Sequence, residues 1–421
     1  MRAVLLLIGV SASLFAILPA LADFPLPHEL PRQEEFPDPL VMLDGTKIES
    51  AGDWQEKRKP ELRALFKHFM YGRYPAKPER VTAKALFEDN EAFGGKATLK
   101  EVELTLGPPE WPKIYLLIAA PQRGRRPCFV GANFGGNHLL TDHAAVHVPD
   151  VWLPEQFPGV VDHRATEAGR GAQADTWPLA EIVRRGYAVA TFYCGDVQPD
   201  RPFVREGMLA TLPESDGPGD PTASSTIMWW AWGIHRAVDY LVTDEGIDAA
   251  RIAVVGHSRL GKTAMVAGAF DERIAVVIPN QAGCGGTAPS RTAEPKAERI
   301  DLLNGVRPHW FCDNFKAFGA EPARLPFDQH SLVALCAPRP VLFTNAADDL
   351  WANPAGQFKV LQATSPVYKL LGEEGLAADE MPEAGDPLID SRLGFWIRPG
   401  KHAMTPADWK IYMDFADKWL K

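Results

Sequence analysis

A short apolar strand that runs directly into a helix constrains this chain more than any other feature of its sequence. Residues 252–255 are all apolar, and a Gly-x-Ser-x-x-Gly motif follows at residues 256–261, where a helical pattern begins. In so sharp a strand–turn–helix connection, Ser258 must take a strained backbone conformation that lifts its hydroxyl above the sheet. A serine that only caps a helix is common, but it would not need the apolar strand and the flanking glycines. The motif therefore predicts a nucleophile elbow with Ser258 at its tip.

Apolar strands and helices alternate along most of the chain. Strands are predicted at residues 98–106, 114–120, 128–134, 187–193, 252–255, 274–278, 341–344 and 393–397. Helices are predicted at 60–72, 177–185, 225–242, 259–270 and 405–420. Such an alternation indicates a mostly parallel central sheet covered on both faces, which is a three-layer α/β sandwich. The long polar insertions at 138–173 and 283–326 are expected to form rims around a site.

A serine nucleophile needs a general base, and one histidine stands where such a fold would place it. With an elbow of this kind, the chain order should be serine, then acid, then histidine. His402 follows the strand predicted at 393–397 and precedes the last helix, so it is the candidate base. His257 is adjacent to the nucleophile and should point away from it, while His309 and His330 come too early in the chain.

The acid of the triad should follow the strand predicted at 341–344. Asp348 and Asp349 both lie there, and either can reach His402. The other would then be solvated or would cap a turn.

Composition excludes several classes of protein. The 421 residues are 46% hydrophobic and 23% charged, which is ordinary for a globular protein. They carry 44 Lys plus Arg against 54 Asp plus Glu, a net charge of −10, and no basic stripe. We therefore expect no nucleic-acid partner, and no fibrous, disordered or polytopic membrane protein. A monomer is expected.

The N-terminus is predicted to be a secretory signal peptide, residues 1–22. Arg2 is followed by an apolar run over 4–18 and by small residues around Ala22, where cleavage is expected. The apolar run is short for a transmembrane anchor. The mature protein would be secreted or periplasmic and free of the membrane, with an N-terminal surface arm at 23–59 and one catalytic domain at 60–421.

Cysteines and histidines give little sign of a metal site. The five cysteines are Cys128, Cys194, Cys284, Cys312 and Cys336. Their odd number leaves at least one free thiol, and their mostly apolar contexts favour small buried side chains, with or without one disulfide whose pairing the sequence does not fix. His143 and His147 have the spacing of two ligands on a helix, but no third ligand stands out nearby. No metal is expected.

Several motifs together resemble those of the glucuronoyl esterases, carbohydrate esterase family 15. They are Asn-Phe-Gly-Gly-Asn-His at 133–138, Trp-Pro at 177–178, Gly-His-Ser-Arg-Leu-Gly-Lys at 256–262, Pro-Phe-Asp-Gln-His-Ser-Leu at 326–332 and Asp-Leu-Trp-Ala-Asn-Pro at 349–354. The resemblance covers most of the chain from about residue 60 onward. It implies an α/β-hydrolase fold and cleavage of esters between 4-O-methyl-glucuronic acid on xylan and lignin alcohols, without a cofactor.

The resemblance also implies roles for single residues. Ser258 would be the nucleophile and His402 the base, with Arg259 beside the oxyanion. Asp349 is favoured over Asp348 as the acid, because it aligns with the family's Asp-x-Trp. The substrate-binding residues implied are Lys262, Trp351 and Glu298.

Two departures from the family pattern are visible. Many members carry the acid as a Glu on the strand after the elbow, where this chain has Gln281. A neutral amide cannot stabilise an imidazolium by charge, so the acid is expected at Asp349 or Asp348. Fungal members also bond two cysteines at the places that His257 and Ala403 occupy here, so that disulfide is absent.

Three functions are compatible with these residues. The first is a secreted serine esterase on glucuronate esters of glucuronoxylan. The second is an acetyl-xylan or other carbohydrate esterase, which would have no need of Lys262 and Trp351 to bind a uronate ring. The third is a non-catalytic carbohydrate-binding homologue, against which Ser258, His402 and Asp349 argue.

Overall fold

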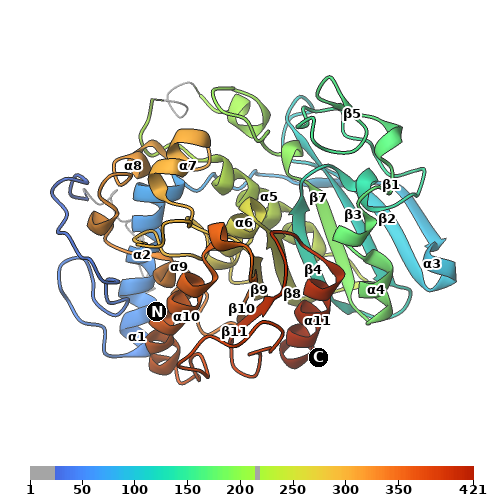
Figure 1. Cartoon of the computed structure of the whole chain (residues 1–421). Helices are drawn as coiled ribbons and strands as arrows, with labels where there is room; N and C mark the ends of the chain where they lie inside the picture. The colour runs from blue at the N-terminus through green and yellow to red at the C-terminus, as the bar shows by residue number, and fades with distance from the viewer. Residues whose placement is uncertain (1–23, 214–218) are drawn as a thin grey trace, which may run out of the picture.

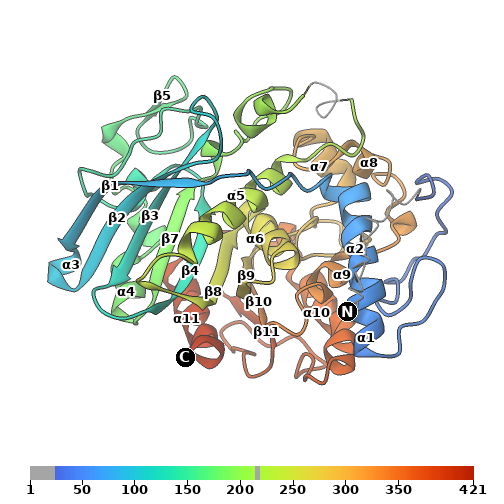
Figure 2. The same ribbon diagram turned by 180° about the vertical axis from the view of Figure 1, so that it is seen from behind.

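A nine-stranded sheet forms the centre of the molecule, and helices cover both of its faces (Figure 1, Figure 2). The computed structural model describes residues 24–213 and 219–421, so the predicted signal peptide lies outside the described residues. The strand order is β1-β2-β3-β7-β4-β8-β9-β10-β11. Strands from β7 to β11 are parallel neighbours, whereas β1, β2 and β3 are joined to one another and to β7 in antiparallel fashion.

The strands of this sheet have the following bounds: β1 Thr82–Glu91, β2 Ala97–Thr105, β3 Lys113–Pro121, β4 Arg126–Asn133, β7 Ala188–Tyr193, β8 Ile247–His257, β9 Ile274–Asn280, β10 Val341–Ala346 and β11 Leu393–Arg398. A separate hairpin pairs β5 Val160–Val161 with β6 Arg164–Ala165. The helices are α1 Ala51–Asp53, α2 Lys59–Phe66, α3 Ala92–Gly95, α4 Leu179–Arg184, α5 Thr226–Leu241, α6 Arg259–Phe270, α7 Ile300–Val306, α8 Asp313–Lys316, α9 Gln329–Ala334, α10 Pro354–Leu370 and α11 Pro406–Leu420.

Two hydrophobic clusters lie on opposite faces of the sheet. Alternate residues of one strand belong to different clusters: Val130 of β4 joins one and Phe129 the other. The larger cluster packs the sheet against α2, α5, α6, α9 and α10, and the smaller packs it against α4 and α11. Burial on both faces explains why the parallel strands are continuously apolar in sequence. The expected three-layer α/β sandwich is confirmed.

Each predicted strand matches one in the sheet, but some elements differ from the prediction. The helical turns that end at Tyr71 begin at Ala51 rather than near residue 60, and Trp54 and Arg58 are buried on them. Edge strand β1 was not predicted, because its side chains are charged and mostly exposed and so show no apolar run. Helix α10 was not predicted either, because it buries small and polar side chains and contains Pro366.

The cysteines of the chain are all buried and unpaired. Burial raises the pKa of the Cys128 thiol, and the negative charge of Asp244 raises it further. These side chains therefore act as small apolar groups in the core. In the part of the chain that the structure describes, no helix is both long and apolar enough to cross a bilayer.

Glycine at the elbow is predicted to contribute strongly to the stability of the fold. A Cβ on Gly256 would lie 2.1 Å from the Leu260 backbone oxygen, where α6 crosses the end of β8. Since neither backbone can move without opening the turn, we expect Gly256→Ala to reduce the free energy of unfolding by about 2–4 kcal/mol. Urea denaturation measures the change.

The matched control is Gly305→Ala. Its Cβ would meet open space in α7, where alanine is the better helix former, so stability should stay the same or rise by up to ~1 kcal/mol. Equal stability of the two variants would contradict this account of the elbow.

Candidate active site

The predicted elbow is present at the end of β8. Ser258 has φ 57° and ψ −127°, a conformation that a non-glycine residue adopts only under strain, and α6 starts at the next residue. Two backbone hydrogen bonds hold it: the Ser258 amide donates to the Asn280 carbonyl over 2.9 Å, and the Lys262 amide donates to the Ser258 carbonyl over 3.0 Å. The strained conformation expected for Ser258 is thus confirmed.

His402 and Asp349 lie in contact at the carboxyl edge of the sheet. His402 Nδ1 is 2.6 Å from Asp349 Oδ2. The Asp349 side chain is 4% exposed, while Asp348 is exposed to solvent. The contact arises because β10 and β11 are adjacent and parallel, so the loops that follow them meet at the same edge. Of the two candidate acids, Asp349 is the one that contacts the histidine.

His257 ties this pair to the elbow. Its ring centroid lies 4.4 Å from that of His402, and its Nδ1 is 2.9 Å from Asn280 Oδ1. Burial, together with the neighbouring His402, lowers the pKa of His257 to about 3, so its imidazole is neutral at neutral pH. His402 therefore stands directly beside the residue that precedes Ser258. His257 was predicted to point away from the nucleophile; its ring contacts Asn280 and His402.

Gln281 holds the loop that carries His402. It follows β9 with φ 48°, a second strained position at the same edge. Its side-chain amide donates to the Ala403 carbonyl over 2.9 Å and accepts from the Ala403 amide over 3.0 Å. Arg398 donates to the carbonyls of Lys401 and Ala403 from the other side. The residue that stands where many relatives have an acid therefore fixes the backbone next to His402.

Arg259 is held by a network that sequence reasoning missed. Its Nε lies 2.6 Å from Asp200 Oδ2 in an ion pair, and its guanidinium lies 4.4 Å from the centre of the Phe134 ring. Trp310 Nε1 donates to Asp200 Oδ1 over 2.7 Å, and His309 Nε2 is 2.9 Å from the same atom. Burial alone would raise the pKa of Asp200, but His309, Arg259 and Trp310 offset it and lower the pKa to about 2.

A signal for Asp200 did exist in the sequence. It follows the apolar strand β7, which is parallel to β4 and so ends at the same edge of the sheet as β8. A carboxylate at such a strand end is a candidate by position. His309 was considered only as a base, and the structure places it beside Asp200 instead.

Lys262, Glu298 and Trp351 form one connected group. Lys262 is buried, and its Nζ donates to Glu298 Oε2 over 2.6 Å and to the carbonyls of Ala282 and Cys284, each over 2.7 Å. The Glu298 amide donates to the Trp351 carbonyl over 2.9 Å. Trp351 is 45% exposed. The three candidate substrate-binding residues are therefore brought together, although Lys262 has all three of its donors engaged by protein oxygens.

Two other histidines considered in the sequence lie away from this group. His143 stacks on Phe87 with centroids 4.8 Å apart, and His147 stacks on Tyr115 at 3.7 Å. Neither lies on a helix. Within residues 24–213 and 219–421, no group of three or more His, Cys, Asp or Glu side chains is arranged to hold a metal ion.

Comparison with known proteins identifies the family. A family model described as "Glucuronyl esterase, fungi" matches residues 218–372. A curated protein from an unknown prokaryotic organism, "Carbohydrate esterase MZ0003", is 42% identical over 91% of this chain and 89% of its own length. A 4-O-methyl-glucuronoyl methylesterase from Phanerochaete carnosa is 28% identical over 82% of this chain and 75% of its own.

Solved structures agree with these relatives. A promiscuous CE15 esterase from a marine bacterial metagenome matches with a TM-score of 0.86 and 40% identity, over 93% of this chain and 98% of its own. A glucuronoyl esterase from Solibacter usitatus matches with a TM-score of 0.85 and 34% identity, over 94% of this chain and 100% of its own. The fold is therefore an α/β-hydrolase fold, and the chain belongs to the glucuronoyl esterase family, carbohydrate esterase family 15.

Proposed function

We propose that this chain is a serine esterase that hydrolyses esters of 4-O-methyl-glucuronic acid, such as those linking glucuronoxylan to lignin alcohols. The observation that carries the proposal is the 2.6 Å contact of His402 Nδ1 with Asp349 Oδ2, next to an elbow that presents Ser258. Relatives that cover most of the chain are named as carbohydrate and glucuronoyl esterases, which supports the substrate class.

The reaction would follow the logic of a serine triad. His402 Nε2 takes the proton from the Ser258 hydroxyl as its oxygen attacks the ester carbonyl, and Asp349 stabilises the imidazolium that forms. The proton then passes to the departing alcohol, leaving a glucuronoyl–Ser258 ester. Water, deprotonated by the same histidine, cleaves this ester and releases glucuronic acid.

Arg259 is the proposed stabiliser of the oxyanion. It begins α6, whose first-turn amides have no partner within the helix and so can face developing negative charge. Asp200, whose low pKa keeps it ionised, pairs with the Arg259 side chain. We infer that Asp200 orients the guanidinium rather than contacting substrate itself.

The uronate ring is proposed to bind between Glu298 and Trp351. The half-exposed Trp351 offers an aromatic face to the sugar, and Glu298 offers carboxylate oxygen to its hydroxyls. Because Lys262 Nζ already has three oxygen partners, we infer that it acts by holding Glu298 in place. A sugar hydroxyl would otherwise have to displace one of these buried contacts.

The remaining parts of the proposal concern processing and assembly. Residues 1–22 are proposed to be removed as a signal peptide, giving a secreted or periplasmic monomer. The mature protein would comprise the arm at 23–59 and the catalytic domain at 60–421. Glucuronoxylan and lignin–carbohydrate esters are the proposed substrates, with no cofactor.

The function is tested by comparing two esters. Benzyl glucuronate should be hydrolysed with a kcat/KM well above that for 4-nitrophenyl acetate, because only the first ester presents a uronate ring to Glu298 and Trp351. Ser258→Ala should lower kcat by about 10⁴-fold or more on both. Preference for the acetate would support a general or acetyl esterase, and no hydrolysis of either ester would point to a binding protein.

The acid is tested by neighbouring isosteric variants. Asp349→Asn should lower kcat on benzyl glucuronate by about 10³- to 10⁴-fold, because an amide leaves the His402 imidazolium without a compensating charge. Asp348→Asn, at an exposed position, should cost less than about tenfold. The opposite ranking would assign the acid to Asp348.

Gln281 is tested as a positioning residue. Gln281→Ala removes both hydrogen bonds to Ala403, so kcat on benzyl glucuronate should fall about 10- to 100-fold as His402 loses its alignment, with KM nearly constant. Gln281→Glu keeps the oxygen that accepts from the Ala403 amide, so its kcat should lie between that of the wild type and that of Gln281→Ala.

A matched control for Gln281 lies on the surface. Gln362 also donates its side-chain amide to a backbone carbonyl, that of Asp379, so Gln362→Ala should leave kcat unchanged. A Gln281→Ala variant that raises KM alone would show that Gln281 supports substrate binding instead of the histidine loop.

A further inference from the structure

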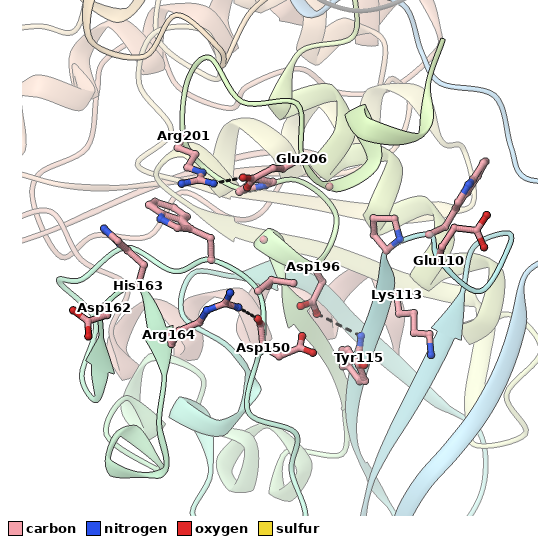
Figure 3. A pocket seen from close by; sticks show the side chains of 17 residues that line it. Glu110, Lys113, Tyr115, Asp150, Asp162, His163, Arg164, Asp196, Arg201 and Glu206 are labelled. Carbon is pink, nitrogen blue, oxygen red and sulfur yellow. Dashed lines mark hydrogen bonds and ion pairs between the residues drawn. The ribbon is translucent and has the colours of Figure 1, made fainter. Parts of the chain in front are cut away.

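Figure 3 shows a pocket of the molecule, and its volume is about 770 Å³. One loop separates it from the proposed active site. Pro199 and Arg201 line the pocket, while Asp200 between them pairs with Arg259 at 2.6 Å. The opposite walls come from residues 110–115 at the start of β3 and from residues 150–164, which reach the β5–β6 hairpin. A ligand in this pocket would therefore be separated by one loop from Arg259, the proposed stabiliser of the oxyanion.

The pocket has an aromatic side with unused hydrogen-bonding groups. Trp111 lies against the backbone of Gly107, where a Cβ would come within 2.4 Å of its Cε3 atom. Tyr115 is stacked on His147 by one face. Among the described residues, neither the Trp111 indole nitrogen nor the Tyr115 hydroxyl has a hydrogen-bond partner. An apolar ring with a free polar edge suits the face and hydroxyls of a sugar.

The wall facing these aromatics is fixed in place. Trp152 is covered by His163, with ring centroids 5.2 Å apart, and by the Arg201 guanidinium at 5.2 Å from its ring. The Tyr193 hydroxyl donates to the Trp152 carbonyl over 2.9 Å, and Arg201 pairs with Glu206 (Figure 3). Because these side chains are already held in place, binding of a ligand against them would cost little conformational entropy.

The charges in the pocket favour hydroxyl groups over anions. Lys113 is paired with Glu103 and Arg201 with Glu206, so these two cations are already neutralised. The third cation of the lining, Arg164, donates to the Asp150 carbonyl and shares the pocket with the carboxyls of Glu110, Asp150 and Asp162. Asp196 is 5% exposed and lines the pocket, and its contact with the Tyr115 amide is long at 3.5 Å. Burial raises the pKa of Asp196 well above its ordinary value, and its carboxyl oxygens lie in the pocket lining where they can accept a hydrogen bond from a ligand hydroxyl.

We propose that this pocket binds a neutral sugar segment of the polysaccharide whose glucuronate ester is cleaved. The identity of the polysaccharide, a xylan, rests on the proposed function. Trp111 supplies the stacking face, and Asp150 and Asp196 receive sugar hydroxyls. An aromatic alcohol would satisfy Trp111 and Tyr115, but its single hydroxyl would serve only one of Asp150 and Asp196, whereas a sugar offers a hydroxyl to each. The pocket therefore favours the polysaccharide that carries the ester over the alcohol that is released.

Calorimetric titration of the full-length Ser258→Ala protein with xylohexaose tests the proposal. Binding should be measurable and should weaken about tenfold in Trp111→Ala and severalfold in Asp150→Asn. Phe203→Ala is the matched control, because Phe203 is 91% exposed on the neighbouring loop but outside this pocket, and it should bind xylohexaose like the parent. Asp150→Asn keeps the test decisive if Trp111→Ala fails to fold.

Kinetics give a second measurement. In Trp111→Ala, the ratio of kcat/KM on a polymeric glucuronoxylan ester to that on benzyl glucuronate should fall about tenfold. The proposal would be overturned by an unchanged ratio, or by a xylohexaose affinity that is the same in Trp111→Ala as in the parent. It would also be overturned if benzyl alcohol bound and xylohexaose did not. Titration does not depend on catalysis. If the protein bound xylohexaose but cleaved no glucuronate ester, the proposed function would be refuted while the proposal that the pocket binds a sugar would stand.

Discussion

Parallel pairing of β10 with β11 is the constraint on which the proposed chemistry depends. It brings the loops after two distant stretches of chain to one edge, where His402 Nδ1 meets Asp349 Oδ2 at 2.6 Å. The same edge receives the elbow because β8, β9 and β10 are also parallel neighbours. A carboxylate that is 4% exposed stays favourable there because the imidazole gives it a polar partner. Strand order therefore decides which of the chain's carboxylates can act on this histidine.

The second constraint is the backbone strain at this edge. Ser258 and Gln281 both have positive φ, and they follow the adjacent strands β8 and β9. Strain of this kind persists only where surrounding contacts hold it. Asn280 supplies such contacts, because its carbonyl accepts from the Ser258 amide and its side chain meets His257 and Tyr412. The amide of Gln281 then fixes the histidine loop through Ala403, a task that needs hydrogen-bond geometry and no charge.

Much of the fold could be predicted because its signals are local. Parallel strands buried on both faces appear as apolar runs, and the elbow needs glycine at a position where a Cβ would meet a backbone oxygen. The edge strand β1 and helix α10 escaped prediction because their side chains carry no apolar periodicity. The start of the first helical segment escaped because burial of Trp54 and Arg58 is decided by the rest of the molecule.

The sequence by itself determined the elbow, the family and the residues available as base and acid, since each depends on residue type and chain order. The family resemblance favoured Asp349 over Asp348, but only the tertiary structure shows which of the two carboxylates contacts His402. The residues alone left both open, because neighbouring aspartates in a loop differ in the direction of their side chains and not in their chemistry. The structure also revealed Asp200 as the partner of Arg259 and Lys262 as a buried support for Glu298. Those contacts join segments that are far apart in the chain, and the sequence does not specify which distant segments come close together in space.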